Sequence, residues 1–473
     1  MKKHQAAVIV WLIVAALMPA VVSAQSGNAP PPPEVRRPYR GLFSGLSTAR
    51  TPQSLVLSGS LFGAYDDNVL SGLNQSNTSA NWHLQNSGVY LGGTVGLDYA
   101  ISRSSQRVDF GAQAGGQLRY YRHEDLSSLV PDYRASADVG FRLGRSTRLR
   151  LGHQFVYSSQ YRLFGVTAEF DDEEIVTGDL IVSDPALDLF LLDSVRNTSR
   201  VSLNHSIGRH TSFTVGYAFR SVDFVEDEGD PEDEGDPVDD GIRVGHLGDY
   251  SVHSGQARLQ YTRPLTAYAS LNLGYGIRVS ESRVGTGEPR VLHDIRAGIS
   301  YSRALSFSRR TSLSFSTGSA ITVNDDLQQP EVDTRTDFRL TGDVELLHEM
   351  GRTWTARAGY FRGFVFREAF AEPYFTDGVH AGLGGLITRR LSFSAVATWN
   401  LSQLQRRGQT GHRGMIATAQ STYALNSFLA LFADYVYYKY KFQEDVLLDP
   451  RFPRLLDRQG VRVGITTSIP LIH

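Results

Sequence analysis

Charged residues recur at alternate positions in many segments of the chain. In YASLNLGYGIRVS, residues 268–280, Arg278 shares one row with Asn272, and the other row holds Leu271 and Tyr275. This alternation is typical of a β-strand with one polar and one apolar face. A guanidinium group on the polar face can hold a carboxylate, phosphate or sulfate through paired hydrogen bonds. The first chemistry that the sequence suggests is therefore the recognition of anions.

Arginines and acids share this polar row throughout the chain. The arginines are Arg119, Arg142, Arg148, Arg150, Arg200, Arg220, Arg258, Arg278, Arg296, Arg339, Arg357 and Arg462. The acids are Asp98, Asp109, Asp138, Asp294, Asp337, Asp343, Glu345 and Asp434. Two interpretations stay open. The arginines can line a channel that prefers anionic solutes, or they can pair with the acids and brace a hydrated wall. The two roles are compatible.

The sequence shows no catalytic constellation. It contains no HExxH, GxSxG or P-loop motif, its histidines are scattered, and His153 and His205 fall on the apolar row. A hydrolytic barrel would need a nucleophile, a base and an orienting group at one rim, and this remains a minor alternative. We therefore predict that the chain is not an enzyme and has no cofactor or metal site.

Two acidic runs lie between the alternating segments, at residues 169–174 and 224–241. Such runs are usually solvated loops. Their carboxylates could also bind calcium, although their spacing matches no calcium-loop template.

The first residues predict export. Lys2 and Lys3 precede an apolar run that ends near Val22, and the following small residues fit signal-peptidase cleavage near Ala24. Residues 1–24 are therefore expected to be a signal peptide. Residues 25–52 contain four consecutive prolines and are expected to form an extended periplasmic linker. The chain has no cysteine, so it has neither disulfides nor a lipid-anchoring cysteine.

Residues 53–473 are expected to form a single β-barrel. About eighteen alternating segments begin near residues 54, 88, 107, 133, 147, 198, 211, 250, 267, 291, 311, 334, 353, 377, 390, 413, 427 and 460. Their connections alternate between short, as at 143–147 and 208–211, and long, as at 123–132 and 162–195.

Short turns at one rim and long loops at the other are typical of outer-membrane barrels. The prediction is an all-β, transmembrane, antiparallel up-and-down barrel of about 18 strands, with short periplasmic turns and long extracellular loops. Barrels of this size enclose water. The formal net charge of −2 argues against nucleic acid as a partner.

Aromatic residues fall on the apolar row near both ends of the segments. Those near short turns are Tyr99, Tyr261, Tyr301, Trp354 and Tyr423, and those near long loops are Tyr65, Tyr120, Tyr157, Trp399 and Tyr437. Tyrosine and tryptophan favour the membrane–water boundary, so two interfacial belts are expected. The ordinary preference of aromatic residues for strands is the alternative explanation.

The end of the first segment carries a short motif, Tyr65-Asp66-Asp67-Asn68-Val69. A strand followed by this motif resembles the start of an outer-membrane beta-barrel porin family that is often encoded with exopolysaccharide synthesis and export genes. The resemblance implies a barrel and, for some members, a route for polymer across the outer membrane. It implies no catalytic residues. The motif can also serve only to end the strand, because Asp and Asn favour turns.

The C-terminal segment departs from the usual outer-membrane pattern. Many such barrels end in an aromatic residue that the insertion machinery recognises, whereas this chain ends in His473 after Pro470. Val461, Val463 and Ile465 keep the alternation, so a final strand is still expected.

These observations together predict a Gram-negative outer-membrane channel that secretes an exopolysaccharide. A structural or adhesive surface barrel and a general diffusion porin are the alternatives. The expected partners are outer-membrane lipids and lipopolysaccharide, an anionic polysaccharide and the barrel-insertion machinery.

Overall fold

The computed structural model describes residues 53–67, 88–102, 107–123, 126–158, 194–224, 250–266, 268–282, 290–305, 308–324, 335–351, 353–365, 374–404, 410–443 and 454–472. The expected signal peptide, proline-rich linker and acidic runs at 169–174 and 225–241 lie outside these residues, as do Asn68, Val69 and His473. Among the residues described, no helix has the length and apolar character needed to cross a membrane.

Eighteen strands make up the described part of the chain. The first nine are β1 (Gln53–Asp66), β2 (Gly88–Ser102), β3 (Val108–His123), β4 (Leu126–Arg142), β5 (Thr147–Ser158), β6 (Ser194–Ser206), β7 (Thr211–Phe224), β8 (Tyr250–Pro264) and β9 (Ala269–Ser282). The second nine are β10 (Arg290–Leu305), β11 (Ser308–Asn324), β12 (Arg335–Met350), β13 (Trp354–Val365), β14 (Tyr374–Leu386), β15 (Leu391–Leu404), β16 (Thr410–Ala424), β17 (Leu429–Phe442) and β18 (Leu455–Ile472).

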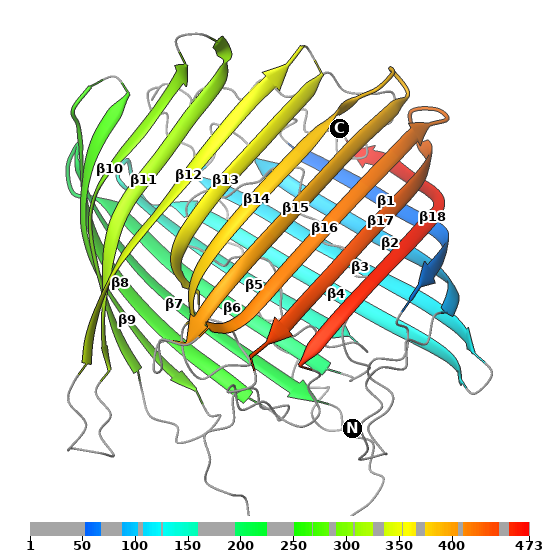
Figure 1. The fold of residues 1–473 in the computed structure, drawn as a ribbon, viewed down its shortest axis with the longest axis horizontal. Helices are drawn as coiled ribbons and strands as arrows, with labels where there is room; N and C mark the ends of the chain where they lie inside the picture. The colour runs from blue at the N-terminus through cyan, green and yellow to red at the C-terminus, as the bar shows by residue number, and fades with distance from the viewer. Residues whose placement is uncertain are drawn as a thin grey trace, which may run out of the picture.

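The strands form one closed antiparallel barrel. Each strand pairs with its neighbours in the sequence, and β18 pairs with β1 to complete the ring. Figure 1 shows the tilted strands following one another around the wall, with the front and back walls inclined in opposite directions. Closure gives the backbone of every strand two neighbours, so the sheet has no free edge. The predicted fold class, antiparallel connectivity and strand number are confirmed.

Most predicted segments begin within a few residues of the observed strands, but β18 begins at Leu455, before the predicted start near 460, and the predicted loop at 123–132 is wrong. Residues 123–132 were expected to form a long connection, whereas β3 ends at His123 and β4 begins at Leu126. The strand contains Pro131, which obscured the alternation in the sequence. The predicted final strand is confirmed. Its register with β1 shifts between Leu55 and Val56, beside Pro470, which lacks a backbone donor.

Several short turns share one pattern of hydrogen bonds. The backbone N–H of Leu143, Ile207, Leu265, Ile387 or Leu425 donates to the carbonyl four residues later. In three of these turns a polar side chain also accepts from the backbone. Asn426 Oδ1, for example, accepts from the N–H groups of Phe428 and Leu429, each at 2.8 Å. Such side-chain acceptors explain why Thr and Asn occur in these turns.

The two faces of the wall differ as the alternation predicts. Leu61, Val89 and Leu91 are 63–75% exposed on the outside, whereas Phe62, Ala64 and Tyr90 are buried on the inside. The strand register places all ten aromatic residues of the expected belts on the outward face. His153 and His205 also point outward, where they bond Ser199 Oγ and Thr147 Oγ1 respectively. The outer wall is therefore mainly apolar and the inner wall mainly polar.

Candidate functional site

The register around the ring places the predicted arginines on the inward face. Residues that lie directly opposite each other on paired strands share one face of the wall. Asp434 on β17 lies opposite Arg462 on β18, which lies opposite Ala64 on β1, and the same pairing can be followed from strand to strand around the barrel. The twelve predicted arginines occupy inward positions. For Arg278 and Arg296 the structure describes the backbone position only. Arg339 donates to Gln403 Oε1 at 3.2 Å and lies over the Phe375 ring, 4.8 Å from its centroid.

Some of these arginines brace the wall. Arg119 is fully buried and pairs with Asp132, whose other carboxylate oxygen accepts from Ser158 Oγ at 2.6 Å. Arg462 donates twice to Asp434 Oδ2, at 2.6 and 3.1 Å. In each pair the charges come from adjacent or nearby strands and neutralise each other inside the wall. The bracing role is therefore confirmed for these two arginines.

Glycines on the inward face let two acids reach across a neighbouring strand. Asp109 lies against Gly140, so that a Cβ there would fall 2.2 Å from Asp109 Oδ2, and the carboxylate comes within 3.5 Å of Arg148 on the next strand. Asp138 lies against Gly152 in the same way and interacts electrostatically with Arg200. Because Gly140 on β4 and Gly152 on β5 have no side chain, each acid can reach an arginine two strands away.

The inward face of β5–β8 carries an excess of positive charge. We call this surface the arginine sector, and its inward arginines are Arg148, Arg150, Arg196, Arg200, Arg220 and Arg258. The described inward rows of the same four strands contain no Asp or Glu. Asp109 and Asp138 approach this sector from β3 and β4 and reach two of its arginines.

The geometry of the arginine sector suits anionic groups. Arg150 and Arg200 are exposed inside the barrel, and the Arg148 side chain is 38% exposed. Arg220 Nε donates to Thr198 Oγ1 at 3.4 Å, which orients the guanidinium beside a hydroxyl group. A solute carrying carboxylate, phosphate or sulfate groups would find charged donors on four adjacent strands.

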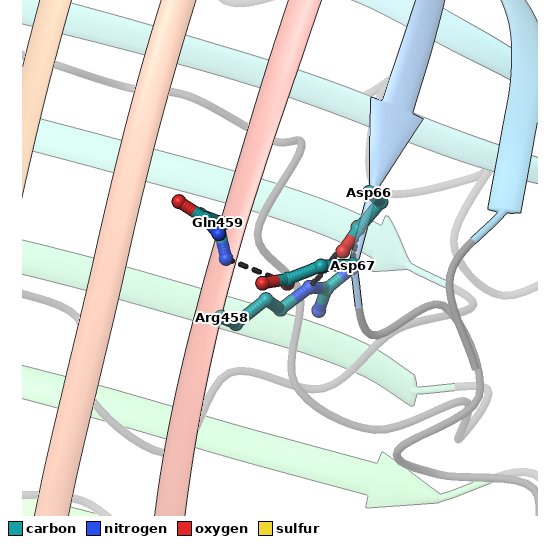
Figure 2. A network of polar contacts seen from close by, with 4 residues as sticks. All are labelled: Asp66, Asp67, Arg458 and Gln459. Atoms are coloured by element: carbon teal, nitrogen blue, oxygen red, sulfur yellow. Dashed lines mark hydrogen bonds and ion pairs between the residues drawn. The ribbon is translucent and has the colours of Figure 1, made fainter. Parts of the chain in front are cut away.

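A second group of inward residues joins the first and last strands. We call the inward faces of β17, β18, β1 and β2 the seam sector. Asp66 and Arg458 are each 1% exposed and form a paired contact, with Arg458 Nε 3.0 Å from each Asp66 carboxylate oxygen. Figure 2 shows these side chains pointing toward each other across the β1–β18 seam. The adjacent Asp67 carboxylate accepts from the backbone N–H of Gln459 at 2.7 Å.

Aromatic rings extend the seam sector toward the short-turn rim. Gly464 lies between Phe62 and Phe432, whose ring centroids are 6.5 Å apart, and a Cβ at this glycine would fall 2.6 Å from Phe62 Cβ. The Arg462 guanidinium lies over both rings, at 5.0 and 5.5 Å from their centroids. Arg462 thus contacts β17 and β1 at once, which makes it a cross-link between three strands.

The sequence interpretation missed several of these residues. Asp132 was expected in a loop, and Arg196 and Arg458 precede the predicted starts of their segments near 198 and 460. Asp66 was identified only as part of the Tyr65–Val69 motif, with no partner assigned to it. Extending the two-residue alternation beyond the predicted strand ends would have placed these four residues on the polar row. Among the residues that the structure describes, no group of His, Asp and Glu is arranged to hold a metal ion.

Comparisons with known proteins give a fold-level likeness only. No protein-family model matches the sequence, and no curated protein is significantly similar. Among solved structures, OpdL of Pseudomonas aeruginosa is 12% identical, with 89% of this chain and 99% of that chain covered and a TM-score of 0.41.

Two further structures have comparable values. OccAB4 of Acinetobacter baumannii is 11% identical, with 90% and 100% covered and a TM-score of 0.42. OccK2 (OpdF) of P. aeruginosa is 9% identical, with 89% and 98% covered and a TM-score of 0.44. These likenesses concern the fold alone.

Proposed function

We propose that the chain is an outer-membrane channel whose lumen favours anionic solutes. The observation that supports this most is the arginine sector, where four adjacent strands present six arginines and no carboxylate on the inward face. Fixed guanidinium groups in a water-filled barrel attract anions and repel cations. The apolar outer wall, with aromatic residues near both rims, suits a lipid bilayer.

The proposed solute is an exopolysaccharide that is secreted across the outer membrane. This finer assignment derives from the resemblance of the segment around Tyr65-Asp66-Asp67 to the porin family encoded with polymer-export genes. The arginine sector adds that an anionic polymer, bearing uronate, phosphate or sulfate groups, is the preferred class. Secretion in a Gram-negative cell, after signal-peptide cleavage near Ala24, is part of the same proposal.

Ion selectivity in a planar lipid bilayer tests the channel. The wild-type protein is expected to give conductance steps and, in a KCl gradient, a reversal potential of the sign for anion preference. Replacing Arg150, Arg200 and Arg258 with Ser should move that potential toward zero.

The matched control replaces three outward arginines, Arg263, Arg362 and Arg413, with Ser and should leave the potential unchanged. Absence of conductance steps would exclude the channel, and an unaltered reversal potential in the inward variant would exclude the role of the arginine sector. Deletion of the gene in its native host should abolish secreted polymer, whereas unchanged surface polysaccharide would favour a general diffusion porin.

A closed structural or adhesive barrel is the second candidate, and one observation favours it. The inward residues Val436, Tyr438, Tyr440 and Phe442 of β17 are only 1–5% exposed, so this part of the inner wall is not lined by water. The bilayer measurement separates the two candidates, because a closed barrel gives no conductance steps.

A further inference from the structure

The outward face of β17 changes character along its length. From the short-turn end to the long-loop end, its outward residues are Leu429, Leu431, Ala433, Tyr435, Tyr437, Lys439 and Lys441. The order is thus aliphatic, then aromatic, then cationic. In a bilayer this order corresponds to hydrocarbon, interface and headgroup.

The spacing of these residues agrees with the thickness of an outer-membrane bilayer. Phe428 lies in the short turn and is 50% exposed, and Tyr437 lies nine positions further along the chain. At about 3.3 Å per residue the segment is about 30 Å long. A strand tilt of about 40° reduces this to about 23 Å along the barrel axis, close to the apolar band of about 25 Å expected for such barrels. Lys439 and Lys441 therefore lie at headgroup height.

These two lysines are the only ones after residue 3, since every other basic side chain except histidine is arginine. Lys439 is paired within the protein, with its Nζ 2.6 Å from Asp457 Oδ2 on β18. Lys441 lies opposite Leu455 of β18, so no acid of β18 faces it directly. The positive charge of Lys439 is thus balanced, while that of Lys441 is not balanced by β18.

On its other side, Lys441 lies directly opposite a second cation. Its partner on β16 is Arg413, and the position beyond Arg413 on β15 is Leu401. Both cations are exposed, and among the described residues neither forms a hydrogen bond or an ion pair. Like charges directly opposite each other on antiparallel strands destabilise the pairing. An external anion between the two side chains would remove this cost.

We propose that Arg413 and Lys441 form a site for the phosphate group of a membrane lipid headgroup, on the outward face of β16 and β17 near the long-loop rim. The inference rests on the proposed membrane location of the barrel. The two cations hold the phosphate, and the acyl chains of the lipid extend along Leu431 and Ala433 past the tyrosines. Free phosphate lacks the acyl contacts and binds the same cations only weakly.

Lipid binding by the full-length barrel in detergent tests this site. The probe is diphosphoryl lipid A, measured by native mass spectrometry, with its dephosphorylated form and inorganic phosphate as comparison ligands. The variant R413Q/K441Q is expected to bind the diphosphoryl lipid about 30-fold more weakly, since each cation near a lipid surface contributes about a fivefold attraction. The conservative variant R413K/K441R should retain binding, and R263Q/R362Q is the matched control for the loss of two outward charges.

Three outcomes would overturn the proposal: unchanged affinity of R413Q/K441Q, equal binding of the dephosphorylated lipid, or complete displacement of the lipid by an equal concentration of inorganic phosphate. Folding of each variant is checked by its heat-dependent shift in electrophoretic mobility. Conductance of R413Q/K441Q is expected to equal that of the wild type. Failure of the lipid site therefore leaves the channel intact, and failure of the channel leaves lipid binding measurable.

Discussion

Arginines in the seam sector and in the arginine sector have the same side chain but different surroundings. At the seam, Arg458 is 1% exposed and bound to Asp66, and Arg462 is bound to Asp434 and covered by two aromatic rings. In the arginine sector, Arg150 and Arg200 are exposed inside the barrel, and the described inward rows of β5–β8 supply no acid.

The difference shows that burial decides what an inward arginine does. A buried guanidinium must be matched by a carboxylate, because an uncompensated charge in a low-dielectric environment is very costly. An exposed guanidinium keeps much of its hydration, and its pairing with an acid is weak, so a solute in the lumen can compete for its charge. The seam sector therefore holds the barrel closed, and the arginine sector is available for transport. The following predictions test this division.

The largest expected effect follows from removing Arg458. The variant Arg458→Ala removes the guanidinium that pairs with the buried Asp66 carboxylate, which should lower the free energy of unfolding by about 3–5 kcal/mol. Denaturant unfolding of the barrel in micelles, followed by tryptophan fluorescence, measures the loss. Replacing both Asp66 and Arg458 with Leu should restore most of the stability, because no isolated charge remains. An Arg458→Ala protein as stable as the wild type would disprove the structural role of this pair.

A smaller effect is expected where Arg462 crosses the seam. A double-mutant cycle between Phe62→Leu and Arg462→Gln should give a coupling energy of about 1 kcal/mol, the scale of a partly buried cation–π contact. The equivalent cycle between Phe393, which lies on the outward face, and Arg462 serves as the control and should give no coupling. Additive effects at Phe62 and Arg462 would show that the rings and the guanidinium act independently.

The smallest effect on stability is expected at the edge of the arginine sector. Asp109 and Arg148 are 40% and 38% exposed, so Asp109→Asn should change the free energy of unfolding by less than about 1 kcal/mol.

The ion selectivity of the channel should respond more strongly to the acids at this edge. The double variant D109N/D138N removes the two acids that reach this sector, and the reversal potential should shift further toward anion preference. A shift toward cations would show that these acids do not compete with solutes for the arginines.

Much of this architecture follows from the amino-acid sequence. Two-residue alternation depends only on strand geometry, so it predicted the number of strands, the apolar outer face and the inward position of the arginines. The predicted strand ends were wrong where the two-residue alternation covers only part of the strand. Pro131 and the polar residues around Arg458 concealed the ends of β4 and β18, and with them Asp132 and Arg458 itself.

Which distant residues pair with each other depends on the closure of the barrel and cannot be read from the sequence. Asp66 and Arg458 are separated by 392 positions in the chain, and they meet because β18 pairs with β1 in one particular register. In the same way, the register of β16 with β17 places Arg413 opposite Lys441, and the register of β4 with β5 brings Asp138 across Gly152 to Arg200. Alternation in the sequence thus determines which side of the wall a residue occupies. Its partner depends on the relative shift of neighbouring strands, which is set by packing and hydrogen bonding over the whole ring.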